Sequence, residues 1–247
     1  RRPNKPPTTG TQVYNAIART GTGAAATVTG VGFAPDMVMP KVRNQSGACT
    51  PYDRLRGALA FLQTSATNAE SSAFSDTLTA FGMDGVSIGA DASFGSINQN
   101  TWTYINHFFK RAPGVFDEVC DTGTGAAHTI SHNLTVVPEL MIRKGRSGGT
   151  QWEVFHSGIA NTEKLILNST AAKATDTTAW NSTSPTASVF TVGTGANVNT
   201  NTATYVTYLF ATLAGISKVG SYTGNGTTQT INCGFTTGAR FILIKRT

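Results

Sequence analysis

"DTGTGAAHTISHNLTVVPELMIRKGRSG", residues 121–148, is the stretch that decides how this chain folds. A Gly-x-Gly sequence is followed by alternating small, polar and apolar residues, then a proline and a basic cluster. Such glycines open either a phosphate-binding loop, which continues into a helix, or a connection within a β-scaffold. The continuation "AAHTISHNL" alternates as a strand does, and the chain contains no Gly-Lys-Ser/Thr sequence. The stretch therefore predicts a hairpin turn and not a phosphate site.

The same pattern occurs at two other places, Gly21-Thr22-Gly23 and Gly224-Asn225-Gly226. The spacings are nearly equal, because 123 − 21 = 102 and 224 − 123 = 101. A period near 100 residues is the size of one β-sandwich domain. We therefore expect an extended arm over residues 1–10, one module over 11–117 and a second over 118–219. Residues 220–247 are either the start of a third module or strands that complete the second.

Strand patterns fill the second copy. "HTISHNL", "ELMIRK", "EKLILNST" and "SVFTVG" alternate, and "ATYVTYLFATL" is long and rich in aromatic residues, as expected of a central strand buried on both faces. Only 13% of the residues are charged, and threonine and glycine punctuate the chain. The predicted fold class is all-β, as tandem antiparallel β-sandwich domains of jelly-roll type. One segment, residues 65–74, has the pattern of a helical turn.

The net charge of +6 is concentrated partly in "RRPNKPPTTG" at the start. Arg1, Arg2 and Lys5 alternate there with prolines, which favour extended backbone outside sheets, so we expect a docking arm. The other basic residues are scattered, unlike the basic face of a nucleic-acid-binding protein. No apolar run approaches the length of a membrane span. Neither nucleic acid nor a membrane is therefore an expected partner.

Patterns that would carry catalysis or metal binding are weak. "GVSIG", around Ser87, resembles a nucleophile elbow, but no helical pattern follows it. The three cysteines are far apart, and the histidines lack metal-ligand spacing. His132 falls on Cys233 when the copies are aligned, so a reactive side chain is not retained between them. We expect no catalytic residue, no metal and no cofactor.

Two places are candidate contacts. Asp53, Arg54 and Arg56 in "YDRLRG" either pin a loop by an Asp–Arg pair or contact a ligand. Trp152 follows the basic cluster and a Gly-Gly turn, where its ring either stacks on a sugar at a loop tip or packs in a sandwich core. These four residues are the candidates for glycan or partner contact.

Two long stretches carry a family resemblance. "HFFKRAPGVFDEVCDTGTG" and "YLFATLAGISKVGSYTGNG", with the strands that follow each, resemble a repeated β-sandwich module of unknown function found in structural proteins of tailed-bacteriophage virions. The resemblance covers nearly all of residues 11–247. It implies a concanavalin- or laminin-G-like jelly roll, and a third copy that continues beyond Thr247. It carries over no catalytic residue.

The resemblance implies a non-enzymatic virion protein, used as a fibre, spike or capsid-decoration component in host attachment. Its partners would be other capsid or tail proteins, and a homo-oligomer would protect exposed sheet edges. Two alternatives stay open: a carbohydrate-binding module that recognises host surface glycans, and a glycan depolymerase.

Overall fold

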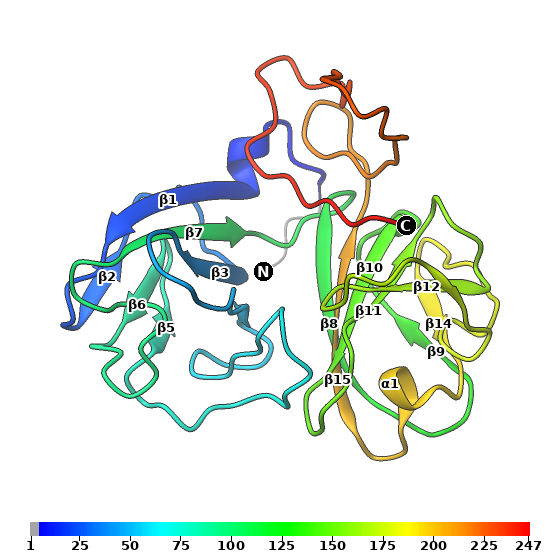
Figure 1. Cartoon of the computed structure of the whole chain (residues 1–247), viewed down its shortest axis with the longest axis horizontal. Coiled ribbons are helices and arrows are strands. Elements are labelled where there is room, and N and C mark those ends of the chain that lie inside the picture. The colour runs from blue at the N-terminus through cyan, green and yellow to red at the C-terminus, as the bar shows by residue number, and fades with distance from the viewer. Residues whose placement is uncertain (1–4) are drawn as a thin grey trace.

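Antiparallel strands form the whole framework of the chain. The computed structural model describes residues 5–247, and within them fifteen strands are joined into four sheets (Figure 1). The helical elements of this part of the chain are a 3-10 turn at Gly10–Gln12 and one short helix, α1, at Ala196–Asn199. The prediction of an all-β fold is confirmed. The predicted helical turn at residues 65–74 is wrong, because Ser71 forms an isolated β-bridge with Phe61 and the backbone around it is irregular.

The first group of strands, which we call the first unit, lies within residues 13–109. Its larger sheet has the order β1-β7-β3-β4, formed by Tyr14–Thr20, Thr103–Phe109, Met37–Val42 and Tyr52–Asp53. Its smaller sheet has the order β2-β6-β5, formed by Ala26–Val28, Val86–Ile88 and Leu78–Phe81. Apolar side chains from both sheets, among them Val38, Phe108 and Ile88, share one core.

The second unit lies within residues 116–211. Its larger sheet has the order β13-β12-β11-β10-β15-β8, formed by Ala174–Thr175, Glu163–Ile166, Glu153–His156, Leu140–Gly145, Thr204–Phe210 and Phe116–Thr122. Its smaller sheet pairs β14, Val189–Val192, with β9, His128–Ser131. Met141, Phe190 and Leu209 belong to the core between them. As the sequence predicts, β15 is a central strand, with five consecutive buried residues.

The two units repeat one pairing scheme in one register. Phe109 of β7 lies opposite Tyr14 and Met37, and Phe210 of β15 lies opposite Phe116 and Leu140. Likewise β2 pairs with β6 as β9 pairs with β14. The sequence repeat is therefore a repeat of strand pairing.

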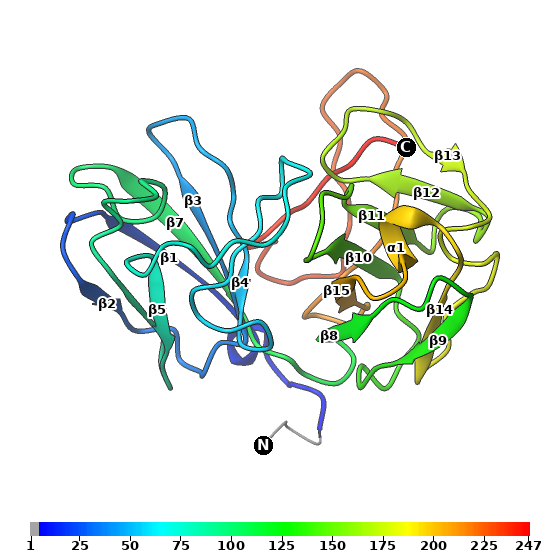
Figure 2. The same cartoon turned by 90° about the horizontal axis from the view of Figure 1, so that it is seen from below.

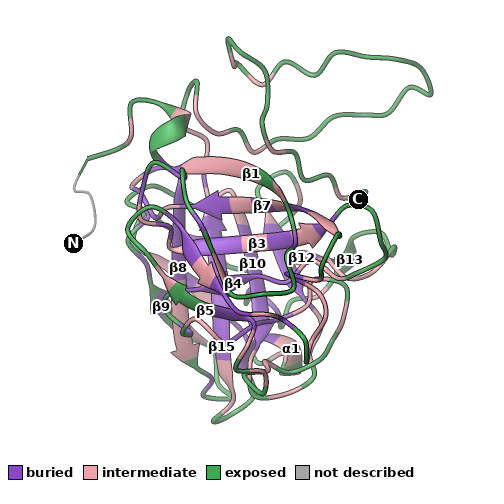
Figure 3. Cartoon of the chain, turned by 90° about the vertical axis from the view of Figure 1, so that its left-hand side faces the viewer, coloured by how far each residue is buried: buried purple, intermediate pink, exposed green. Residues whose placement is uncertain are grey.

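The units lie side by side (Figures 1 and 2) and share a third apolar cluster. Met37 and Phe109 of the first unit's larger sheet enter this cluster together with Val206 and Tyr208 of the second unit's larger sheet. Each larger sheet thus has one face in its own core and the other face toward the neighbouring unit. Figure 3 shows how the buried residues concentrate in these sheets.

The structure describes all of residues 218–247 and has no strand among them, so these residues do not complete the sheets of the second unit. The orange and red trace in Figure 1 leaves β15, loops over the top of the molecule and returns between the units. Of the predicted arm, Lys5 is exposed, and Arg1 and Arg2 lie outside the described residues.

Candidate functional site at the contact between the units

The Gly-x-Gly loops are not hairpin turns, which corrects the expectation from sequence. In each unit the loop leaves a strand of the larger sheet and enters a strand of the smaller one, from β1 to β2 and from β8 to β9. A Cβ on Gly21 would lie 2.1 Å from the carbonyl oxygen of Gln99, and one on Gly123 would lie 2.2 Å from that of Thr200. Glycine is required because the two backbones touch.

A buried asparagine closes each loop. In the first unit the Nδ2 of Asn98 donates to the carbonyl oxygens of Ala24 and Gly89, both at 2.8 Å, and its Oδ1 accepts from the amide of Thr22 at 3.3 Å. In the second unit Asn199 makes the equivalent three bonds, to Ala126, Gly193 and Thr124, at 2.8, 2.6 and 2.8 Å.

A tyrosine completes the same frame in both units. The hydroxyl of Tyr104 accepts from the amide of Gln99 at 2.9 Å, and the hydroxyl of Tyr205 accepts from the amide of Thr200 at 2.8 Å. The loop amides that a phosphate would need are already bonded to these side chains and to the backbone oxygens of the two asparagines. The loops are structural clamps.

Ionisable side chains meet where the units touch. Asp53, at the end of β4, is fully buried; its carboxylate accepts from Arg56 Nε at 2.5 Å and from the hydroxyl of Tyr208, on β15, at 2.7 Å. Arg56 also reaches Tyr208 Oη at 3.2 Å and Glu70 at 3.0 Å, and Glu70 receives Arg146 of the second unit at 2.9 Å. We call Asp53, Arg56, Glu70, Arg146 and Tyr208 the latch.

Burial and neighbouring charge set the protonation states in the latch. Burial alone would lower the pKa of Arg56, but its contacts with Tyr208 and with the carboxylates of Asp53 and Glu70 outweigh burial and raise that pKa. Burial raises the pKa of Tyr208 well above its ordinary value, so its hydroxyl stays a donor to Asp53. A buried ion pair of this kind fixes geometry more than it adds stability, yet removal of one partner costs about 3–5 kcal/mol.

A further acid, Glu118 of β8, interacts with the charges of Asp53 and Arg56 in the same contact. It is 1% exposed, and neither carboxylate oxygen has a hydrogen-bond partner among residues 5–247. Burial and, next, the negative charge of Asp53 raise its pKa well above the ordinary value. The strand register places Ala16 at the equivalent position of the first unit. The unit itself therefore does not need an acid at this position.

Two further polar groups of the second unit reach across the contact. Trp152 is 1% exposed, packs in the shared apolar cluster and donates its Nε1–H to the carbonyl oxygen of Gln63 at 2.9 Å. Lys144 is buried; its Nζ donates to Thr67 O at 3.0 Å, and burial lowers its pKa to about 8. The tryptophan therefore has no free ring face for a sugar and serves as an anchor between the units.

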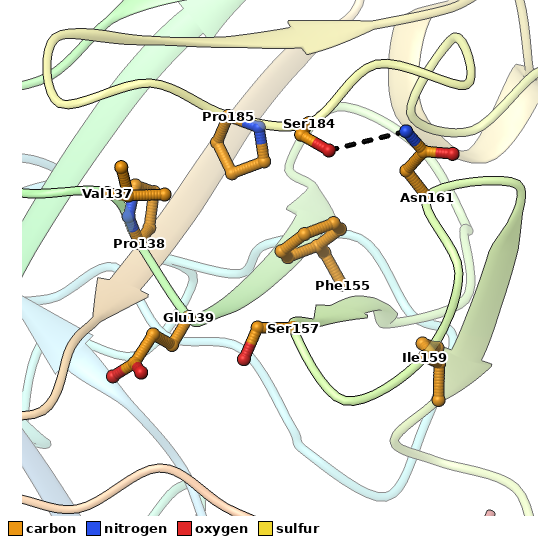
Figure 4. Close-up of a pocket in the computed structure, with 9 residues that line it drawn as sticks. All are labelled: Val137, Pro138, Glu139, Phe155, Ser157, Ile159, Asn161, Ser184 and Pro185. Atoms are coloured by element: carbon orange, nitrogen blue, oxygen red, sulfur yellow. Dashed lines mark hydrogen bonds between the residues drawn. The ribbon is translucent and has the colours of Figure 1, made fainter.

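A separate open pocket of about 200 Å³ lies on the second unit (Figure 4). Its polar groups are the side chains of Ser157, Asn161, Ser184 and Glu139, and Asn161 Nδ2 donates to Ser184 Oγ at 3.3 Å. The other lining residues are Val137, Pro138, Phe155, Ile159 and Pro185. Glu139 is the single carboxylate of this lining, and it already accepts from the amide of Thr212 at 2.5 Å. Glycoside hydrolysis needs a pair of carboxyl groups, which this pocket does not supply.

The structure separates the residues that the sequence grouped in "YDRLRG". Asp53 and Arg56 form the predicted loop-pinning pair and extend it into the latch. Arg54 is exposed, bonds the carbonyl oxygens of Pro35 and Gly82, and lies over the ring of Phe81. Ser87, the centre of the elbow-like "GVSIG", sits within β6, opposite Thr27. Its hydroxyl is therefore not on a sharp turn.

Sequence reasoning missed the functional partners that lie far away along the chain. Tyr208 and Glu118 approach Asp53, and Arg146 approaches Glu70, only through the packing of the two units. Asn98 and Asn199 had a detectable signal, because they lie 101 residues apart (199 − 98 = 101), as the repeat requires.

Within residues 5–247, no three His, Cys, Asp or Glu side chains converge as ligands for a metal ion. Cys49, Cys120 and Cys233 are free thiols. Neither helical element of the same residues has the length and apolar character of a membrane span. The polar side chains described above therefore belong to two features of residues 5–247, the clamps of a β-scaffold and the contact between its two repeated units.

The fold and this contact define an all-β protein of internally repeated units. Residues 9–247 match the family described as a domain of unknown function, DUF7483, and the chain belongs to that family. No curated protein matches the chain significantly, and no solved structure does.

Proposed function

We propose that the chain is a non-enzymatic structural protein of a tailed-bacteriophage virion, in which tandem β-sandwich units form a rigid fibre, spike or capsid-decoration element. One observation carries the proposal. The same clamp of glycine, asparagine and tyrosine recurs in both units, while the buried ionisable groups hold the units to each other.

Rigidity between units supports a load-bearing role. Trp152, Lys144 and Tyr208 all cross from the second unit to bond groups of the first. Contacts within a chain that join apolar packing to buried ion pairs restrict relative motion of the parts, whereas a small polar interface permits it. The resemblance of the repeats to virion modules supplies the biological setting, and the arm containing Lys5 would dock onto capsid or tail proteins.

The decisive experiment places the chain on an intact particle. We expect an antibody raised against residues 5–247 to label purified phage particles at a regular position, seen by electron microscopy. Removal of residues 1–10 is expected to reduce incorporation of the protein into particles. Absence of label from particles of a phage that encodes the chain would overturn the virion assignment.

The two alternative functions are separated by direct assays of the same protein. A glycan array on which binding is lost in Asn161→Ala, at the pocket of Figure 4, would support a carbohydrate-binding module. Release of reducing sugar from a host polysaccharide would support a depolymerase. The proposal expects neither signal, because Trp152 is buried and the pocket contains a single carboxylate among its described residues.

A further inference from the structure

Residues 218–247 expose an unusual amount of apolar surface. Ile242 and Ile244 are 68% and 65% exposed, and Tyr222, Ile231 and Leu243 are each exposed by 44–50%. Within residues 5–247, this segment makes no backbone–backbone hydrogen bond. Figure 3 shows its exposed trace beside the strand-rich body. An extended segment with exposed apolar side chains, whose amides and carbonyls lack backbone partners, is a template for strand addition.

The segment begins as the second unit begins. Ala112 and Phe116 form an isolated bridge around Gly114, with φ of 77°, and Leu213 and Ser217 form the same bridge around Gly215, with φ of 75°. In the first case the chain continues into β8, its Gly-x-Gly loop and then β9 and β10. After Ser217 it continues into Gly224-Asn225-Gly226 and the apolar run at residues 241–244.

Both complete units show what such a segment requires. Their first and third strands do not pair with each other; β7 lies between β1 and β3, and β15 lies between β8 and β10. The inserted strands read "TYINHFF" and "TYVTYLF", and each follows a clamp asparagine, Asn98 or Asn199. In both units the inserted strand and the residues just before it thus contain the tyrosine and the asparagine that close the Gly-x-Gly loop.

The third loop lacks these partners. A Cβ on Gly224 or Gly226 would meet nothing within 4 Å, whereas one on Gly21 or Gly123 would collide with a carbonyl oxygen. Part of the segment is already held to the first unit: Phe241 packs edge-on against Phe109, and Arg240 donates to Asn15 Oδ1 at 2.9 Å. This anchoring leaves Ile242 and Ile244 facing outward.

We propose that residues 218–247 are an acceptor surface whose occupant is the remainder of a further copy of the same unit. Its central strand would insert between the segments at residues 219–222 and 241–246. Recognition would require an asparagine ahead of a Thr-Tyr-x-x-x-x-Phe strand, since that pattern supplies the clamp and the apolar face. The inference depends on the repeat and not on the virion role.

The chain's own sequence supplies the probe. Residues 147–211 are appended directly after Thr247, where the register of the repeat places them. Hydrogen exchange is then followed over residues 219–246. We expect these amides to exchange at least about tenfold more slowly than in the unextended chain, because local protection follows hydrogen bonding and burial. A matched control carries Asn199→Ala and Tyr205→Ala in the appended copy only, and we expect it to lose most of the gain.

Gly224→Ala gives a second measure that does not rely on exchange. The substitution is expected to raise the melting temperature of the unextended chain slightly, and to lower that of the extended chain, since a clamped loop would then crowd the new methyl group. Unchanged exchange on extension would overturn the proposal. So would a dimer of the unextended chain, seen by light scattering, in which residues 219–246 are already protected. Either result leaves the labelling of particles unaffected.

Discussion

Gly123→Ala and Gly224→Ala form a matched pair that tests the clamp. Both glycines open the same motif after a threonine. A Cβ on Gly123 would lie 2.2 Å from Thr200 O and 3.0 Å from the ring of Tyr205, whereas one on Gly224 would meet nothing within 4 Å. The first substitution forces backbone apart, and overpacking of this kind costs about 1–3 kcal/mol. The second removes freedom only from the unfolded chain, which is worth about 0.4–1 kcal/mol of stabilisation.

The two variants should therefore differ by roughly 1.4–4 kcal/mol in the free energy of unfolding. For a chain of this size, each kcal/mol moves the melting temperature by about 2–4 °C. Calorimetry and urea unfolding at one pH measure the difference, and circular dichroism checks that both variants keep their strand content. If the free energy of unfolding of Gly123→Ala lies within about 0.5 kcal/mol of that of the unsubstituted chain, the close approach to Thr200 is wrong and the clamp does not stabilise the fold.

Four further substitutions test the clamp and the contact between units. Asn98→Ala and Asn199→Ala each remove three hydrogen bonds, at about 1 kcal/mol per bond, so urea unfolding should show losses of about 2–4 kcal/mol in each case. Tyr208→Phe keeps the ring but removes the donor to Asp53, and a loss of about 1.5–3 kcal/mol is expected, since that bond involves a charged group; a loss below 0.5 kcal/mol would show that the latch does not bind the units. Glu118 has a raised pKa in the folded state, so the folded chain binds its proton more tightly than the unfolded chain does, and its contribution is fully present below about pH 4.5 and is lost as pH rises through the folded pKa. Glu118→Gln should therefore flatten the expected fall in stability as the pH rises above about 4.5, measured from urea midpoints, and an unchanged slope would contradict the buried, protonated state.

The sequence predicts the strands that recur in both units, but it does not predict how strands are joined or which residues meet at the contact between the units. The aromatic and apolar residues of "ATYVTYLF" predict β15, because a strand buried on both faces needs apolar residues on each. The prediction of hairpins at the Gly-x-Gly loops is wrong because a glycine pattern indicates backbone conformation and close approach, but not which strands are joined. The sequence does not distinguish a loop-tip position for Trp152 from a core position, because only the packing of one unit on the other buries this side chain.

The clamp positions are retained between the units, whereas polar positions that face the neighbouring unit have diverged. Asn98 and Asn199, or Tyr104 and Tyr205, make the same bonds in both. By contrast, the strand register makes His107 and Tyr208 equivalent positions, since His107 lies opposite Met39 and Tyr208 lies opposite Ile142. These two side chains differ, and they bond different partners, Tyr14 for His107 and Asp53 for Tyr208. Ala16 and Glu118 differ at another such position. A residue that serves the internal fold has the same task in every copy, whereas a polar or charged side chain at the contact needs a complementary partner on the facing sheet. Divergence between internal copies therefore marks the surface on which neighbouring units meet, and in this chain that surface carries the latch.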